Sequence, residues 1–315
     1  IRDDVESRGL GDVYKRQVWR KENREVHKFL RAIGFSDITK KDLEMILDEV
    51  ITRPEIMKIT KDSEGNEFAE LSGSFAANAG ITVRGTYQED DSFHMDYYYP
   101  YVFGTSITTN EQIDVEKHAE KESYAGVCDE VNLGVTLIFY IQNVADYLAE
   151  TNRHLSKIHY GAMLAGLSTE GKILCPVVER KKNDVPAIQK NDRHNQLIAQ
   201  AREGDEDAIE SLTLEDMDTY ALLSQRVMKE DIFSIVKSTF MPFGIESDQY
   251  TVLGEIIDCV TMENKLTHEK LYGMKLLCNN IQFDVCINEK DLLGEPAIGR
   301  RFRGNVWMQG NLCLE

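Results

Sequence analysis

The sequence predicts an α+β protein: a mainly antiparallel sheet domain with packed helices, then a helical segment and a small β-barrel, for which an OB-like arrangement is one option. Three observations predict this class. Two short helical patterns open the chain after residue 26, strand-like runs with turn signals fill most of residues 55–178, and further strand-like runs follow a helical region after residue 195. A length of 315 residues suits about two domains of roughly 150 residues each.

The first elements are helical. Residues 27–33 predict a short helix that stops at Gly34, and residues 39–51 predict a second helix with Thr39 as its N-cap and Asp42 three residues later. Apolar side chains recur on one face of the second helix, which predicts that it packs on another element, and Pro54 ends it.

The rest of the first half indicates strands. We expect a meander of antiparallel strands over residues 55–104, a central strand over 132–142, which is apolar on both faces, and a helical turn over 143–150. Residues 157–167 and 172–178 indicate a hairpin around the turn at 168–171.

The second half begins after a polar, highly charged and aperiodic stretch at residues 179–195, the best candidate boundary between domains at 26–180 and 181–315. Residues 196–226 are helical in composition. Five strand-like runs then predict the small barrel, at residues 232–240, 250–260, 271–278, 281–287 and 301–314.

Residues 1–25 look extraneous. The segment 12–17 (DVYKRQ) resembles one translated frame of the transposase end sequence used in sequencing libraries, which suggests adapter sequence at the start of a metagenomic gene and a true start near Val26. The alternative is a loose charged arm. Under the first interpretation we expect residues 1–17 to pack against nothing.

Charge and cysteine content bound the function. The net charge of −18 argues against unaided binding to nucleic acid or to an anionic membrane. No apolar run approaches the roughly 20 residues that span a bilayer. The six cysteines form no C-x-x-C pair and follow no signal peptide, so we expect reduced cysteines and a cytoplasmic, bacterial protein.

Signatures of catalysis are missing. The sequence has no phosphate-binding glycine loop, no G-x-S-x-G elbow and no histidine or cysteine spacing typical of a metal site. His154 and His159 are five residues apart, a spacing that does not suit a shared metal site, and His94 has only Asp96 beside it. We therefore interpret these three histidines as exposed side chains and not as metal ligands. We expect no cofactor, metal or catalytic residue.

Two segments are candidate binding surfaces. Residues 87–101 mix tyrosines, including Tyr97, Tyr98 and Tyr99, with acidic residues, which suits the docking of a basic partner. The favoured alternative is a long hairpin whose tyrosines cover a core. The second segment is the last strand. A face with arginines and an exposed tryptophan suits the binding of an anion or a peptide. Alternation places five side chains on this face: Arg301, Arg303, Asn305, Trp307 and Gln309.

The second surface also has a favoured alternative. Residues 203–218 carry eight acidic residues and no basic one, and fail the calcium-loop pattern because Glu210 stands where glycine is required. Arg301 and Arg303 could pair with this acidic segment, which would also cover Trp307.

Several blocks resemble a known family. HKFLRAIGFSDI near the start, LTLEDMDTYALLSQRVMKEDIFSIV, and MPFGIESDQYTVLGEI with FDVCINEKDLLGEPAIGRRFRGNVWMQG are similar to the uncharacterised bacterial family domain of unknown function 3881. The resemblance covers residues 27–314. It implies a stand-alone cytosolic protein and no assigned activity.

We therefore expect a non-catalytic cytosolic binding or regulatory protein, with an unidentified protein or small molecule as its partner and an open oligomeric state. One alternative is a metal-dependent hydrolase with ligands dispersed in the sequence. Another is an acidic immunity-type protein or nucleic-acid mimic, which requires residues 87–101 and 203–218 to form one negative face.

Overall fold

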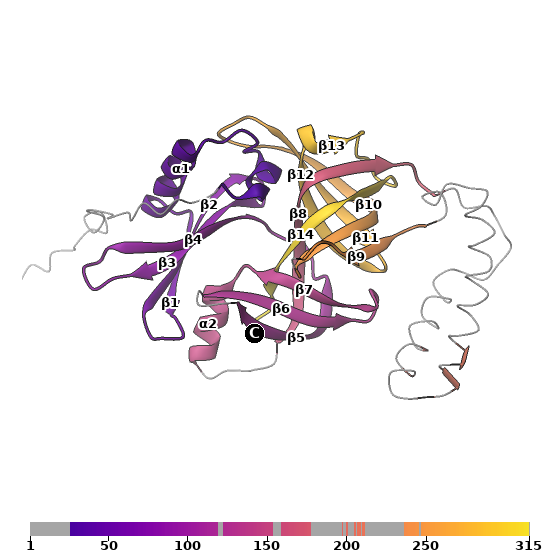
Figure 1. The fold of residues 1–315 in the computed structure, drawn as a ribbon, viewed down its shortest axis with the longest axis horizontal. Coiled ribbons are helices and arrows are strands. Elements are labelled where there is room, and N and C mark those ends of the chain that lie inside the picture. The colour runs from indigo at the N-terminus through magenta and orange to yellow at the C-terminus, as the bar shows by residue number, and fades with distance from the viewer. Residues whose placement is uncertain are drawn as a thin grey trace, which may run out of the picture.

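The computed structural model describes residues 26–118, 122–153, 159–177, 236–245 and 247–314, with a few separate residues between 197 and 211 (Figure 1). The described chain is mainly β. A four-stranded antiparallel sheet, sheet A, lies beside a larger mixed sheet of ten strands, sheet B. The helices are few and short, so the predicted α+β class is confirmed only for the antiparallel sheet with packed helices.

Both predicted N-terminal helices form. The 3₁₀ helix η1 (Lys28–Ile33) ends at Gly34, whose φ of 95° is in the left-handed region that favours glycine. Helix α1 (Lys40–Thr52) is capped by the Thr39 side chain, which accepts a hydrogen bond from the backbone N–H of Asp42. The apolar face of α1 packs on sheet A, as its periodicity predicts.

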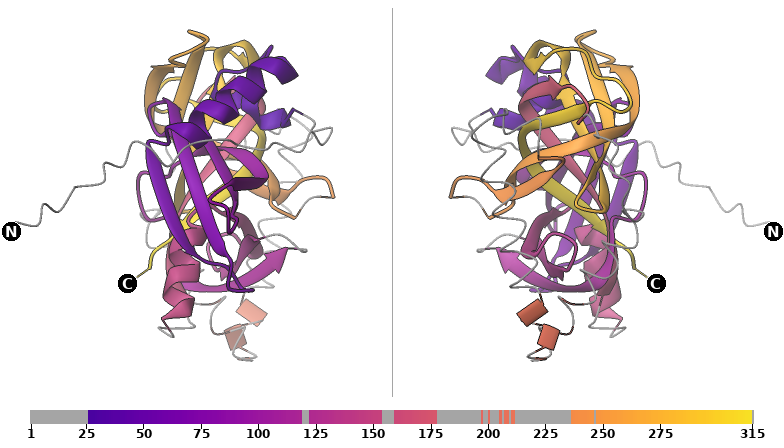
Figure 2. Two further views of the ribbon diagram at one scale, coloured as in Figure 1. Left: turned by 90° about the vertical axis from the view of Figure 1, so that its left-hand side faces the viewer. Right: turned by 90° about the vertical axis from the view of Figure 1, so that its right-hand side faces the viewer.

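Sheet A is the predicted meander. Its strands are neighbours in chain order, each antiparallel to the next: β1 (Ile56–Lys61), β2 (Glu67–Ala76), β3 (Ala79–Tyr87) and β4 (Phe93–Val102). Helix α2 (Val144–Asn152), which follows the predicted central strand, packs on β1 and β2. Figures 1 and 2 show sheet A and α1 on one side of sheet B.

Sheet B joins strands from both halves of the chain. Its members are β5 (Thr109–His118), β6 (Ser123–Glu130), β7 (Val135–Ile141), β8 (His159–Leu174), β9 (Thr239–Pro242), β10 (Gln249–Glu263), β11 (Lys270–Cys278), β12 (Ile281–Asn288), β13 (Leu292–Leu293) and β14 (Arg301–Leu312). A single 3₁₀ turn, η2 (Glu289–Asp291), precedes β13. Strand β7 lies between β6 and β14, so the predicted central strand is confirmed.

The predicted hairpin at residues 157–178 is wrong. Strand β8 runs for 16 residues through the supposed turn, because it pairs with β14 along its length and with β12 on its other edge. A bulge between Asn305 and Val306 absorbs the polar segment, and the Ser168 hydroxyl donates to the carbonyl of Asn305 there. Local turn propensity is overridden by pairing with strands far along the chain.

The prediction of a small separate β-barrel is also wrong. Strands β8, β14, β10, β11 and β12 form a closed ring of hydrogen-bonded pairings within mixed sheet B. The ring is completed by β8, which the sequence assigns to the first domain. The predicted domain boundary lies in residues 178–196, which are outside the described residues. Residues 1–25, which we predict to be extraneous, are also outside the described residues.

Two hydrophobic clusters fill the interior. One lies inside the ring of sheet B and extends to β6, β7 and α2, with Phe283 and Phe302 fully buried. The other lies between sheet A, the two N-terminal helices and the outer face of sheet B, and it includes Phe29 and Trp307. The Trp307 side chain on the outer face of β14 is therefore covered by η1.

A buried arginine ties the two sheets together. Arg84 on β3 has no exposed surface, and its Nε donates to Glu70 Oε2 at 2.8 Å across the β2–β3 pair. From sheet B, Arg84 Nη1 donates to the Tyr140 hydroxyl at 2.9 Å, and Nη2 donates to the carbonyl of Gln142 at 2.6 Å. Tyr97 and Tyr99 on β4 accept further bonds at 3.0 Å. Each of the three guanidinium nitrogens thus donates to at least one protein group.

Substituting Arg84 by methionine should destabilise the protein strongly. R84M leaves the Glu70 carboxylate buried without its partner, and we expect the free energy of unfolding in urea to fall by about 3–5 kcal/mol. The double variant R84M/E70M should regain part of that loss. The control K265M removes an exposed pair with Glu55 and should change stability by less than about 1 kcal/mol. A small effect of R84M would contradict a central role for this residue.

Candidate functional site

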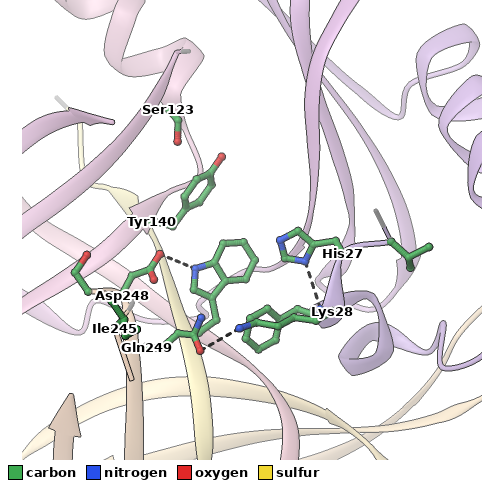
Figure 3. A pocket seen from close by; sticks show the side chains of 11 residues that line it. His27, Lys28, Ser123, Tyr140, Ile245, Asp248 and Gln249 are labelled. Carbon is green, nitrogen blue, oxygen red and sulfur yellow. Dashed lines mark hydrogen bonds between the residues drawn. The ribbon is translucent and has the colours of Figure 1, made fainter. Parts of the chain in front are cut away.

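An open pocket of about 720 Å³ lies where η1 meets sheet B (Figure 3). The described lining comes from five parts of the chain: the start of η1, the start of β6, the end of β7, the segment from the end of β9 to the start of β10, and β14. The lining residues are Val26, His27, Lys28, Phe29, Ser123, Tyr140, Ile245, Ser247, Asp248, Gln249 and Trp307. We call it the Trp307 pocket.

Aromatic rings form one wall of the pocket. The Trp307 side chain on β14 stacks on Phe29 with ring centres 5.2 Å apart, and the His27 ring lies 5.1 Å from it. Tyr140 approaches the same indole at 5.4 Å. The indole N–H donates to Asp248 Oδ2 at 2.7 Å, so the ring is held at its edge as well as on its face. The orientation of Trp307 is fixed on several sides.

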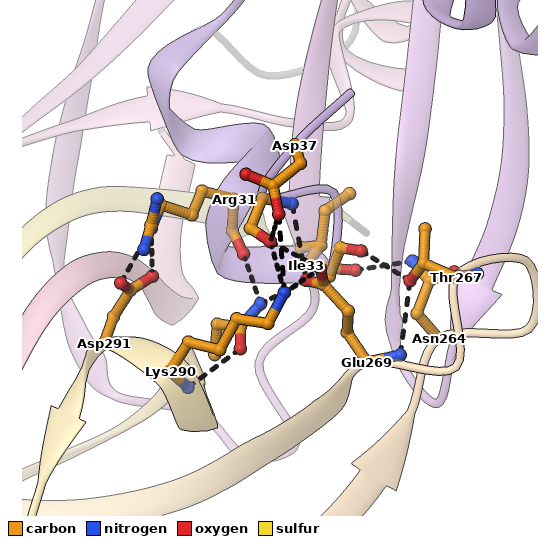
Figure 4. Close-up of polar contacts among 11 residues, drawn as sticks. Arg31, Ile33, Asp37, Asn264, Thr267, Glu269, Lys290 and Asp291 are labelled. Atoms are coloured by element: carbon orange, nitrogen blue, oxygen red, sulfur yellow. Dashed lines mark hydrogen bonds and ion pairs between the residues drawn. The ribbon is translucent and has the colours of Figure 1, made fainter. Parts of the chain in front are cut away.

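Polar contacts with η2 and with the loop between β10 and β11 hold η1 in place (Figure 4). Arg31 forms an ion pair with Asp291, in which Nε donates to both carboxylate oxygens, at 2.7 Å to Oδ1 and 2.5 Å to Oδ2. The buried Asn264 amide donates to the carbonyl of Ile33 at 2.7 Å, and Thr267 donates to the carbonyl of Gly34. These bonds satisfy carbonyls at the end of η1 and thereby place His27 and Phe29 against Trp307.

Glycine is required at position 34 for space as well as for backbone conformation. A Cβ there would lie 2.6 Å from the Cβ of Asn264, which is buried and already bonded to η1. The close approach of the η1 end to the loop after β10 therefore depends on this residue.

The His27 ring stays neutral at pH 7. It caps η1, since its Nδ1 accepts a hydrogen bond from the backbone N–H of Phe29. Burial lowers the pKa of His27 to about 4, with a smaller effect from the neighbouring charge of Lys28. Among the described lining residues, the charged groups are consequently one ammonium, Lys28, and one carboxylate, Asp248.

Serine, histidine and aspartate all line the pocket, but they do not form a catalytic triad. A triad needs the aspartate to accept a hydrogen bond from the histidine Nδ1–H. Here Nδ1 of His27 is an acceptor, Asp248 is bonded to Trp307, and Figure 3 shows Ser123, His27 and Asp248 around different sides of the pocket. Across the part of the chain that the structure describes, no three His, Cys, Asp or Glu side chains gather as a metal site.

A second serine has a charged neighbour at the turn between β1 and β2. The Ser63 hydroxyl lies 2.7 Å from Lys117 Nζ, but Glu122 takes a bond from each of them. Burial disfavours ionisation of Glu122, yet hydrogen bonds from Lys117, Ser63 and Tyr124 outweigh it and lower its pKa. Lys117 thus donates hydrogen bonds to both Ser63 and Glu122, an arrangement unsuited to taking a proton from Ser63.

The predicted face of β14 forms, but most of it is covered. Trp307 is 7% exposed rather than exposed as one hypothesis required, and its cover is η1. Gln309 is fully buried, where its amide accepts from Gln142 and donates to the carbonyl of Pro100. Arg301 is buried as well and donates to the carbonyls of Cys175 and Val236, whereas Arg303 is exposed. Of these four residues only Trp307 lines the pocket.

The tyrosines of β4 point inward instead of forming an acidic docking strip. Tyr97 and Tyr99 bond Arg84, and Tyr98 accepts a hydrogen bond from the backbone N–H of His27 at 3.0 Å. Only 8% of Tyr98 and 3% of Tyr99 is exposed. The favoured alternative, that these side chains cover a core, describes Tyr98 and Tyr99 correctly. Most of residues 203–218 lie outside the described residues, so the pairing and the continuous negative face stay predictions.

The comparisons with known proteins bear on the family alone. The family model described as "Domain of unknown function, E. rectale Gene description (DUF3881)" matches residues 30–310. The chain belongs to the DUF3881 family. The comparisons with curated proteins and with solved structures gave no match. The resemblance seen in the sequence is thus confirmed.

In this DUF3881 chain, most of the pocket residues carry no local signal. His27, Phe29 and Tyr140 belong to an amphipathic helix and a central strand, as ordinary core residues would. Asp248 lies in a short loop. The one sequence signal for the pocket is the tryptophan on the alternating last strand. Its partners in the pocket could not be predicted, because they are 59 to 280 residues away in the sequence.

The DUF3881 chain should lose stability in acid through His27. Below about pH 6.5 the unfolded chain takes up a proton at this residue, while the folded ring stays neutral until about pH 4, so unfolding becomes easier as pH falls through that window. Asparagine is a good N-cap and does not titrate. The H27N variant should therefore show a flatter pH dependence between pH 6.5 and 4, measured by urea unfolding at several pH values. Parallel curves for the two proteins would contradict the assignment.

Proposed function

We propose that this DUF3881 protein is a non-catalytic binding protein that holds a small organic molecule with a planar apolar part in the Trp307 pocket. The observation that carries the proposal is the aromatic wall of Trp307, Phe29 and Tyr140, with polar groups placed at its edge. Small-molecule pockets combine these two features and measure roughly 300–1,000 Å³. The volume of about 720 Å³ is within that range.

The build of the site supports binding rather than a purely structural role for these rings. Ser123 and Tyr140 line the pocket from sheet B, and Lys28 lines it from η1, so the cavity lies at a junction of elements. Junctions of this kind are common locations of ligand sites. The Trp307 indole is also preorganised by Asp248 and Phe29, which lowers the entropy cost of binding.

The net charge of the chain favours a small ligand over a nucleic acid as the partner. With a net charge of −18, a nucleic acid would be repelled over most of the surface, whereas a small ligand meets only the local charges of the pocket. None of the helices in the described segments is both long and apolar enough to cross a membrane. A cytosolic location remains part of the proposal.

A fluorescent probe tests the proposal directly. 1-Anilinonaphthalene-8-sulfonate binds apolar pockets, and Trp307 becomes the sole tryptophan in a W19F background. We expect saturable probe emission excited through Trp307, at one site per chain. S123F fills the pocket and should abolish this signal, while S92F, on the turn between β3 and β4, should not. Equal probe binding by both serine variants would refute the site.

A further inference from the structure

We propose that the ligand of the Trp307 pocket is a zwitterion of the α-amino acid class with an aromatic side chain. This inference rests on the proposed function and specifies its ligand. The geometry behind it is a pocket that offers one ammonium and one carboxylate beside a wall of aromatic rings.

Gln249 links the two charged groups at the edge of the wall. Lys28 Nζ donates to Gln249 Oε1 at 3.3 Å, and Asp248 is the residue next to Gln249 in the chain. Figure 3 shows the labelled Lys28 side chain reaching toward Gln249, with Asp248 alongside. A ligand with its own carboxylate and ammonium on one carbon can present the carboxylate to Lys28 and the ammonium to Asp248.

Side-chain chemistry allows these contacts alongside the existing ones. An ammonium has three donors, and a carboxylate accepts on both oxygens, so each group can engage several partners at once. Asp248 Oδ2 already receives the indole N–H of Trp307 at 2.7 Å, which couples the charged end of the pocket to the aromatic wall. Charge-assisted bonds of this type are about twice as strong as neutral ones.

A ligand with a single charge fits this lining less well. His27 adds no third charge, because burial keeps its ring neutral. A purely anionic ligand would face the Asp248 carboxylate, and a purely cationic one would face Lys28; like charges placed together in this way weaken binding. The aromatic side chain is selected separately, since Tyr140, Trp307 and Phe29 all line the pocket.

Three probes of matched shape test the inference: L-phenylalanine, phenethylamine without the carboxylate, and 3-phenylpropanoate without the ammonium. Binding is measured by the change in Trp307 fluorescence in the W19F background. We expect L-phenylalanine to bind about tenfold more tightly than either analogue, the difference that one charge-assisted hydrogen bond makes.

Variants identify the groups responsible. K28M should remove the advantage of L-phenylalanine over phenethylamine, and D248N should remove its advantage over 3-phenylpropanoate. The matched controls K270M and E289Q break an exposed ion pair between β11 and η2 and should leave all three affinities unchanged.

The outcomes separate this inference from the proposed function. If 1-anilinonaphthalene-8-sulfonate binds in the pocket but the three probes bind equally or not at all, the zwitterion is wrong and the binding function stands. If L-phenylalanine binds best and K28M or D248N does not alter the preference, the assignment of the charged groups is wrong. If neither the fluorescent probe nor any of the three binds, the proposed function itself fails.

Discussion

The guanidinium of Arg84 is the charge on which the rest of the structure depends. It has no exposed surface, and the rings of Tyr99 and Tyr140 lie 4.8 and 5.4 Å from it. A charge without water must be met by protein groups on every side. These groups come from both sheets, so sheet A and sheet B have to meet at this point in one arrangement. The Tyr140 hydroxyl is one of the partners, and the same residue lines the Trp307 pocket. The position of one pocket wall is thus set by the contact between the sheets.

Much of the local structure could be predicted from the sequence, because short-range chemistry determines it. Gly34 ends η1 through its left-handed backbone, Thr39 caps α1, and short strand-like runs separated by turn signals mark the strands of sheet A. Long-range pairing could not be predicted. The segment around Ser168 contains turn-forming residues, yet β14 and β12 hold it extended from both edges. The same pairing replaces the expected separate barrel with a ring inside sheet B.

The site was predictable only at one residue. Alternation along β14 identifies Trp307 and the face it occupies, but it does not reveal that η1, some 280 residues earlier, covers that face. Alternation also predicts that one face of β14 is exposed to solvent. In the structure β14 lies between other strands of sheet B, and side chains on both of its faces are buried. For this reason Gln309 is a buried amide instead of a surface group. Buried Arg84 could not be distinguished in the sequence from an exposed strand arginine.

Our proposal depends on a ligand site against Trp307 at the junction between η1 and sheet B. The most direct measurement is a crystallographic screen in which crystals of the full chain are soaked with a library of small aromatic fragments. We expect density for fragments between the Tyr140 ring and the edge formed by Asp248 and Lys28. Fragments bound repeatedly elsewhere, with the pocket empty of all of them and unobstructed in the crystal, would contradict it.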